Sequence, residues 1–243
     1  MTSYLMPPAK LNLELEVLGL RPDGTHEVST VLQAISLFDL ITITPAAESS
    51  LLTGGSFPVT TGPDNLVLRA AAEIELTAEF SLEKSIPPGA GLGGGSSDAA
   101  AVLRASWLPT SHLEPLAARL GADVPFFLRG GRMRATGRGE VLEPLAVEEA
   151  WYALAWPGYE VSTAAVYQAW DRVGGEGRNH LFRPACAVEP RLAEFAAKLG
   201  DGWVMTGSGS AFFKEAATEA EARALAAGHE CWTAVAGALD PWG

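Results

Sequence analysis

The chain has 243 residues, and its 29 acidic and 17 lysine or arginine side chains give a formal net charge of −12. This charge argues against partners that need a basic surface, such as nucleic acids and anionic membranes. Its composition, 48% hydrophobic and 19% charged, is typical of a globular protein long enough for two compact domains. Because it has only 2 cysteines, no signal-peptide pattern in residues 1–10 and no apolar run long enough to cross a bilayer, we predict a soluble cytoplasmic protein.

The first predicted elements are β-strands. Residues 9–18 alternate between apolar and polar side chains, with Lys10 and Asn12 together on the polar face, which predicts a half-buried strand. By itself, a lone lysine on such a strand is expected to be solvated. Residues 21–24 (Arg-Pro-Asp-Gly) predict a turn, because proline fixes φ and glycine tolerates positive φ. A second β-rich run is expected over residues 28–43.

The next segments alternate between helix and strand. Helical spacing predicts a helix over residues 65–76, and alternation predicts a strand from residue 80 to the Pro87-Pro88 pair. A glycine-rich loop follows, and a Ser/Asp signal then introduces a helix over residues 99–107. Another short helix is expected over residues 113–120, ending at a glycine.

The remaining chain shows weaker periodicity at first. Residues 122–146 are predicted as short β runs and residues 171–185 as a loop, with a domain boundary near residue 148. The elements expected after that boundary are a strand over 151–156, helices over 164–170 and 190–199, strands over 202–206 and 211–213, and a helix over 216–228.

The strongest motif is the glycine-rich segment that follows the Pro87-Pro88 pair. Its five glycines allow the backbone to approach a ligand closely, and the helix behind it offers unpaired N–H groups to an anion. The hydroxyls of Ser96 and Ser97 could add contacts to phosphate or metal. The order of these elements, a rigid proline pair followed by a glycine loop and a helix, indicates a phosphate-binding loop rather than a flexible linker.

The type of phosphate loop is not decided by this segment alone. Gly89, Gly91 and Gly94 satisfy the pattern G-x-G-x-x-G of dinucleotide-binding folds, although no alternating βα units precede it. The lysine that ends a P-loop is absent, since Gly95 is followed by Ser96.

Two further segments are weak signals when taken singly. Asp123 lies in Leu-Gly-Ala-Asp-Val-Pro (120–125), where a turn or cap residue is the ordinary interpretation and a proton acceptor the alternative. The glycine- and serine-rich residues 206–210 predict a hairpin turn that could also face the phosphate loop.

Together these segments resemble the GHMP kinase superfamily, and within it the enzymes that phosphorylate 4-diphosphocytidyl-2-C-methyl-D-erythritol. The resemblance extends over nearly the whole chain. It is carried by residues 8–13, 21–27, 64–67, 87–98, 120–125 and 206–209. It implies an α+β fold with two domains: residues 1–148, similar to ribosomal protein S5 domain 2, with the ATP-binding glycine loop, and residues 149–243, ferredoxin-like.

The resemblance implies transfer of the γ-phosphoryl group of ATP to the 2-hydroxyl of the cytidyl substrate, with Mg²⁺ bridging phosphate oxygens. Lys10 and Asp123 match the catalytic lysine and aspartate of these enzymes. The residues expected to bind ATP are Asn65, Leu66, Pro87, Pro88, Gly89, Ala90, Gly91, Leu92, Gly93, Gly94, Gly95, Ser96 and Ser97. The residues expected to bind the substrate are Asn12, His26, Thr163, Tyr167, Gly207 and Gly209, with His26 on the cytosine and Tyr167 stacking on it.

Thr25 departs from the pattern, because these enzymes usually carry a stacking tyrosine before the histidine. Tyr167 alone could hold the base, a neighbouring aromatic residue could substitute, or binding could be weaker. The metal ligands are left unassigned, and the chain is expected to be a monomer or a weak homodimer.

Three alternative functions compete with this interpretation. Another GHMP small-molecule kinase would have no cytosine for His26 and Tyr167 to bind. An NAD(P)-dependent oxidoreductase would use Gly89, Gly91 and Gly94 for the dinucleotide. An RNA-binding module with an S5-like domain conflicts with the net charge.

Overall fold

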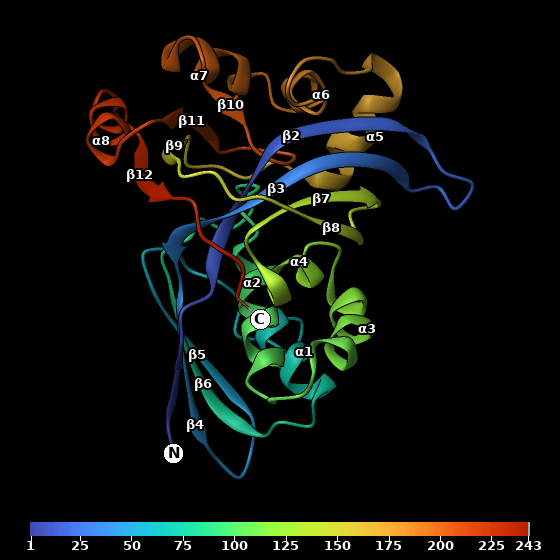
Figure 1. The fold of residues 1–243 in the computed structure, drawn as a ribbon, viewed down its shortest axis with the longest axis vertical. Helices are drawn as coiled ribbons and strands as arrows, with labels where there is room; N and C mark the ends of the chain where they lie inside the picture. The colour runs from blue at the N-terminus through green and yellow to red at the C-terminus, as the bar shows by residue number, and fades with distance from the viewer. Residues whose placement is uncertain (243) are drawn as a thin grey trace.

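The computed structural model describes residues 1–242, which form three four-stranded sheets and eight helices (Figure 1). The sheets have the strand orders β1-β4-β6-β5, β2-β3-β7-β8 and β10-β11-β9-β12. Among these named strands only the β5–β6 pair is parallel. The α+β fold predicted from the sequence is thereby confirmed, and the parallel sheet that a dinucleotide-binding fold requires is not present in the described part.

The bounds of the elements are as follows. The strands are β1 (Ser3–Leu5), β2 (Pro8–Leu20), β3 (His26–Phe38), β4 (Leu40–Pro45), β5 (Ser50–Gly55), β6 (Ala78–Lys84), β7 (Arg132–Gly137), β8 (Val141–Leu145), β9 (Trp151–Trp156), β10 (Val204–Met205), β11 (Phe212–Ala216) and β12 (Trp232–Gly237). The helices are α1 (Leu66–Glu73), α2 (Gly94–Arg104), α3 (Thr110–Leu120), α4 (Val124–Arg129), α5 (Thr163–Val173), α6 (Phe182–Val188), α7 (Arg191–Leu199) and α8 (Glu219–Ala227).

The long β2–β3 hairpin runs between the two halves of the molecule. In Figure 1, α1–α4 lie below it, α6 and α7 lie above it, and α5 overlaps it. Its turn lies where the sequence predicts one. The polar face of β2 differs from the prediction, however, because Lys10 and Asn12 are buried while Glu14 and Glu16 are exposed. The start of β2 is buried on both faces, and along its edge the N–H of Lys10 donates to the carbonyl of Leu92 in the glycine loop.

The third sheet lies between two parts of the hydrophobic core, because successive side chains of β9 point to opposite faces of the sheet. Tyr152 and Leu154 face the β2–β3 hairpin and form a core with the glycine-loop side chains Ala90 and Leu92. The intervening alanines Ala153 and Ala155 face α5–α8. Small side chains on this face let the helices approach the sheet closely. The glycine loop is therefore packed against the C-terminal half rather than left free.

Three helices begin or occur where the sequence predicts otherwise. Helix α6 begins at Phe182, inside the segment 171–185 that is predicted as a loop. Helix α2 begins at Gly94, five residues before the expected start, and its N-cap Gly93 has left-handed backbone (φ 72°) with no side-chain cap. The Ser/Asp signal thus lies inside the first turns. Helix α4 forms within a segment predicted as β, because Pro125 stands at its start, where the missing N–H is tolerated. Among the described residues, none of the helices is long and apolar enough to cross a membrane.

The end of the chain returns to the first half. The N–H of Leu239 donates to Ala34 in β3, and the N–H of Trp242 donates to Arg129 at the end of α4. The gap between β8 and β9 includes the expected boundary near residue 148. The division into residues 1–148 and 149–243 stays a prediction, and these tail contacts cross it.

Candidate active site

A cavity of about 330 Å³ gathers segments that are far apart in the sequence. We call it the Lys10 cavity. Strand β2, the glycine loop, the residues before α4, the start of α5 and the turn between β10 and β11 all contribute to its wall. The predicted site residues that line it are Lys10, Asn12, Gly89, Gly91, Gly93, Ser96, Asp123, Thr163, Tyr167, Gly207 and Gly209.

The cavity contains an ion pair between its two predicted catalytic residues. Nζ of Lys10 lies 3.4 Å from Oδ2 of Asp123. The lysine side chain is 5% exposed and the aspartate side chain 38% exposed. A buried cation therefore supports a carboxylate that is still open to the cavity, so the carboxylate can reach a bound molecule.

A chain of hydrogen bonds fixes Lys10. Its ammonium donates to Oδ1 of Asn12, and the amide of Asn12 donates to the hydroxyl of Thr30 over 2.8 Å. Thr30 in turn donates to the carbonyl of Glu14. The backbone N–H of Asn12 donates to Oγ1 of Thr206 over 2.9 Å, which ties β2 to the C-terminal turn. Lys10 is thus held in place before any ligand arrives.

The glycine loop fits tightly between the two halves. The N–H of Ala211 donates to the carbonyl of Ala90 over 3.0 Å. A Cβ on Gly91, which has φ 80°, would lie 2.4 Å from the carbonyl oxygen of Thr206. Only glycine combines this positive φ with so close an approach, so the loop is a rigid cradle rather than a linker.

A second cavity, of about 380 Å³, lies on the other side of the same loop. We call it the Asn65 cavity. It shares Gly89, Gly91, Gly93 and Ser96 with the Lys10 cavity. The other predicted nucleotide-binding residues that line it are Asn65, Leu66, Pro87, Pro88, Ala90, Gly94 and Gly95. The glycine loop therefore forms a partition with one cavity on each side, and a phosphate chain at the loop would be within reach of both.

The aromatic side of the Lys10 cavity is formed by α5. Thr163 and Ser208 share a hydrogen bond of 2.8 Å between their hydroxyls. Tyr167 lines the cavity, and burial together with the charge of Asp123 raises its pKa to about 12. His26 stacks behind Tyr167, with ring centroids 4.9 Å apart. His26 is not among the lining residues.

His26 is itself held from a second side. Its Nε2 lies 2.8 Å from Oδ1 of Asp171, and the ring of Trp170 meets it edge-on at 5.6 Å. These contacts tie the start of β3 to α5 next to the cavity.

Two predicted nucleotide-binding residues point elsewhere. The side chain of Leu92 is buried in the core, and its carbonyl is taken by Lys10. Ser97 is buried on the face of α2 away from Ser96 and lines a different cavity. One helical residue turns the chain by about 100°, which separates neighbouring hydroxyls that look equivalent in the sequence.

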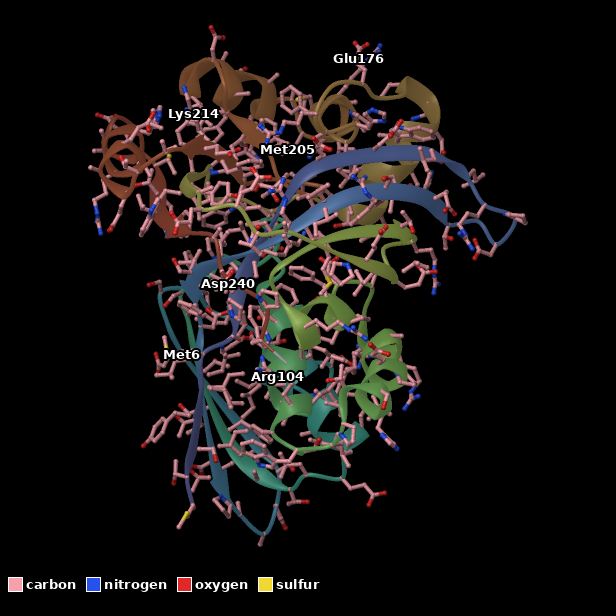
Figure 2. The ribbon with its side chains drawn as sticks, viewed as in Figure 1. Met6, Arg104, Glu176, Met205, Lys214 and Asp240 are labelled. Atoms are coloured by element: carbon pink, nitrogen blue, oxygen red, sulfur yellow. The ribbon has the colours of Figure 1, made fainter. Side chains whose placement is uncertain are left out.

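Sequence reasoning missed three residues of this site. Buried Asn179 donates to the carbonyls of Met205 (labelled in Figure 2) and Gly207 and so shapes the C-terminal turn. Thr206 binds the backbone of β2, as described above. Arg138, from the turn after β7, adds a second cation to the wall of the Lys10 cavity. No motif marks Asn179 or Arg138, because each acts through contacts between distant segments, whereas Thr206 lies in the segment 206–209 that carries the resemblance.

A buried ion cluster adjoins the Asn65 cavity, whose lining includes Lys84 and Asp98. Lys84 pairs with Asp39 and, over 2.9 Å, with Oδ2 of Asp98, and all three residues are at most 2% exposed. Asp39 also accepts the N–H groups of Ser85 and Ile86. Oδ1 of Asp98 has no partner among the described residues. Two carboxylates thus share one ammonium, and burial raises the pKa of Asp98 to about 7, although the charge of Lys84 opposes this shift.

Replacing Asp98 by asparagine is expected to flatten the pH dependence of stability. The folded pKa of about 7 lies above the unfolded value, so folding favours the protonated form. That stabilisation is complete below pH ~4 and is lost as the pH rises through 7, with a limiting slope of about 1.4 kcal/mol per pH unit. Asp98→Asn should therefore raise the free energy of unfolding by on the order of 1 kcal/mol at pH 8 and by less at pH 5.

Urea unfolding of both proteins between pH 5 and pH 8.5 measures this difference. Glu79→Gln, at an exposed position of β6, serves as the control and should keep the wild-type profile. Parallel profiles for wild type and Asp98→Asn would contradict the expectation.

Comparison with known proteins supports the geometric interpretation. The GHMP kinase N-terminal domain family matches residues 65–131, which include the glycine loop and Asp123. The chain is 39% identical to a 4-diphosphocytidyl-2-C-methyl-D-erythritol kinase from Paracoccus denitrificans (strain Pd 1222), with 96% of each chain covered. A crystal structure of 4-(cytidine 5'-diphospho)-2C-methyl-D-erythritol kinase is 36% identical, covers 97% of this chain and 99% of its own, and has a TM-score of 0.77.

A more distant likeness shows the shared fold alone. A mevalonate kinase structure with 11% identity has a TM-score of 0.68 and covers 98% of this chain and 99% of its own. The resemblance drawn from the sequence motifs is confirmed, and the oxidoreductase and RNA-binding alternatives are not. The chain therefore belongs to the 4-diphosphocytidyl-2-C-methyl-D-erythritol kinase family of GHMP kinases.

Proposed function

We propose that the protein transfers the γ-phosphoryl group of ATP to the 2-hydroxyl of 4-diphosphocytidyl-2-C-methyl-D-erythritol, giving the 2-phosphate and ADP. The observation that carries this proposal is the glycine-loop partition, with the Asn65 cavity on one side and the Lys10–Asp123 pair on the other. A donor nucleotide and an acceptor alcohol need two adjoining spaces with a phosphate cradle between them.

ATP fits the Asn65 side of the partition. Gly89, Gly91 and Gly93 have positive φ angles, and a Cβ atom at any of them would clash with neighbouring atoms. Without side chains at these positions, the backbone itself can surround the phosphates. Helix α2 begins directly behind them and directs its positive end towards the loop. This backbone device explains how a chain with a charge of −12 can hold a triphosphate without a basic patch.

Asp123 and Lys10 would act on the acceptor side. The carboxylate of Asp123 takes the proton of the 2-hydroxyl while that oxygen forms its bond to the γ-phosphorus and the bond to the β–γ bridging oxygen breaks. Lys10 places a fixed positive charge beside the carboxylate and the transferring group. Both residues are in position without ligand, so little reorganisation is required.

Magnesium fits this site as a companion of the nucleotide. Among the described residues no group of three or more histidine, cysteine, aspartate or glutamate side chains could form a metal site of its own. Mg²⁺ commonly uses one or two protein oxygens together with phosphates and water. Ser96 lines both cavities and would hold the ion together with phosphate oxygens, and the ion would neutralise phosphate charge when bound.

Tyr167 would provide the surface on which the cytosine stacks, with His26 behind it. Thr25 cannot stack, and Trp170 is the aromatic residue that the structure places nearest to this pair, edge-on to His26. We infer that Tyr167 supports the base and that the Trp170 and Asp171 contacts keep His26 oriented for hydrogen bonding.

Replacing Tyr167 by leucine is expected to raise KM for the cytidyl substrate about 10-fold or more, with KM for ATP unchanged. The loss of one base–aromatic stack costs about 1–3 kcal/mol. Tyr167→Phe keeps the ring and should retain the wild-type KM, which separates stacking from the contribution of the hydroxyl. Steady-state kinetics measure both constants, and an unchanged KM in Tyr167→Leu would place the base elsewhere.

One coupled assay of ADP release tests the proposed function. The purified protein is given ATP with the cytidyl substrate, mevalonate or homoserine in parallel. We expect turnover with the cytidyl substrate at least 100-fold above the other two. Comparable turnover with mevalonate or homoserine would instead assign a different GHMP kinase activity.

We also propose that the protein works in the cytoplasm, where ATP is supplied, as a monomer or weak homodimer that binds small molecules rather than nucleic acid. The net charge of −12 and the two unpaired cysteines support this proposal.

A further inference from the structure

A third cavity, of about 450 Å³, lies on the far side of α2 from the glycine loop. We call it the Arg104 cavity. Helix α2 contributes Ser97, Ala101 and Arg104, which share one helix face. The segment around β1 forms the opposite wall, and Figure 2 labels Met6 from that segment and Arg104 from α2. None of the activity proposed above uses this cavity.

The cavity has one charged side chain among its lining residues. Arg104 is that residue, and within residues 1–242 it has no carboxylate within ion-pair distance. Its guanidinium lies 5.6 Å from the ring of Trp242, which holds it by a cation–π contact. Arg104 is exposed as a whole, but the protein atoms around its guanidinium desolvate it in part and lower its pKa. A cation in this state gains from an anion that brings its own apolar surroundings.

A second polar group at this cavity lacks a partner. Ser97 is 1% exposed, and its Oγ makes no hydrogen bond among the described residues. Buried hydroxyl groups are normally hydrogen-bonded. A polar ligand atom brought to this wall of the cavity would give the hydroxyl its partner.

The rim of the cavity exposes large apolar side chains. Tyr4 is 71%, Met6 63% and Trp107 92% exposed. Trp107 also has φ 58°, a left-handed conformation that is unfavourable for a bulky residue. An exposed, strained tryptophan next to a cavity is typical of a residue kept for binding rather than for packing.

We propose that the Arg104 cavity binds a small organic monoanion, a carboxylate with an apolar body. The guanidinium matches a carboxylate in shape and charge, and the inner walls from Leu113 and Phe127 are apolar. One cation in a molecule of net charge −12 disfavours a dianion. The volume is that of a small-molecule site.

Calorimetric titration with three probes of equal chain length tests this assignment: octanoate, 1-octanol and octyl phosphate. Saturating ADP is present throughout, so that the Asn65 cavity is occupied. Octanoate should bind at least 10-fold more tightly than 1-octanol and no more weakly than octyl phosphate.

Three variants identify the site. Arg104→Gln should remove the preference for octanoate over 1-octanol. Arg223→Gln, at an exposed arginine of α8, should retain that preference. Trp107→Ala should lower the affinity for octanoate and for 1-octanol by the same factor, because the indole would contact the apolar body that both probes share. Arg104 and Trp107 are both exposed, so the variants should fold, and circular dichroism checks this.

Several results would overturn the proposal. Equal affinity for octanoate and 1-octanol in the wild type, or equal behaviour of Arg104→Gln and Arg223→Gln, would remove the role of the cation. Tighter binding of octyl phosphate than of octanoate would show that the ligand class is an organophosphate and not a carboxylate. A homodimer that Trp107→Ala dissociates, together with no octanoate binding, would assign this face to self-association instead.

Discussion

Replacing Asp123 by asparagine is expected to lower kcat by about 10³-fold, with KM for ATP within about twofold of the wild type. The carboxylate is the group that accepts the hydroxyl proton, and loss of a positioned general base costs 10²–10⁴-fold in rate, roughly. Asparagine keeps the size of the side chain and one oxygen towards Lys10, 3.4 Å from the carboxylate in the wild type. The variant should therefore fold normally and still bind the nucleotide on the other side of the glycine loop.

Single-turnover phosphorylation and ADP titration separate these two effects. Asp201→Asn, at an exposed turn of the C-terminal half, is the matched control and should keep the wild-type kcat. A kcat in Asp123→Asn within tenfold of the wild type would show that Asp123 only anchors charge. In that case the Lys10–Asp123 pair would contribute to catalysis only by positioning the reacting groups.

Replacing Lys84 by methionine is expected to destabilise the protein by about 3–5 kcal/mol at pH 8, because removal of one partner leaves buried charge uncompensated. Lys84 is the only cation that pairs with Asp39 and Asp98 among the described residues. Both carboxylates are at most 2% exposed, so solvent screens their charge only weakly once the ammonium is removed. The deficit should shrink at pH 5, because burial raises the pKa of Asp98 to about 7 and its carboxyl is then protonated.

Urea unfolding measures this loss, and two further variants interpret it. Lys198→Met, at an exposed position of α7, should change the free energy of unfolding by less than about 0.5 kcal/mol. The triple variant Lys84→Met/Asp39→Asn/Asp98→Asn carries no charge in the cluster and should recover most of the lost stability. If the triple variant were as unstable as Lys84→Met, packing rather than charge would be the cause.

Local chemistry in the sequence predicted several of the segments that the structure brings together around the Lys10 cavity. The five glycines after a proline pair gave the cradle, since positive φ and close approach are properties of glycine itself. The alternation of residues 9–18 predicted strand β2, and the Asp in residues 120–125 gave a candidate carboxylate. The start of α2 was predicted late, because its N-cap is a glycine without a capping side chain.

What the sequence could not reveal depends on contacts between its two halves. Lys10 would be solvated on an isolated strand, yet it is buried because the glycine loop and the turn at residues 206–210 cover that face. Asn179 belongs to the site only through its bonds to that turn.

The sequence by itself therefore predicted the chemistry of this protein: an anion cradle made from backbone, one lysine, one aspartate and a net charge that argues against polyanionic partners. The tertiary structure decided the geometry. It placed the Lys10–Asp123 pair and the Asn65 cavity on opposite sides of one loop, buried the Asp39–Lys84–Asp98 cluster next to that cavity and left Arg104 without a carboxylate among the described residues. The physical reason is that conformational preference is a property of each residue, whereas burial and charge pairing are set by whichever segments the fold brings together.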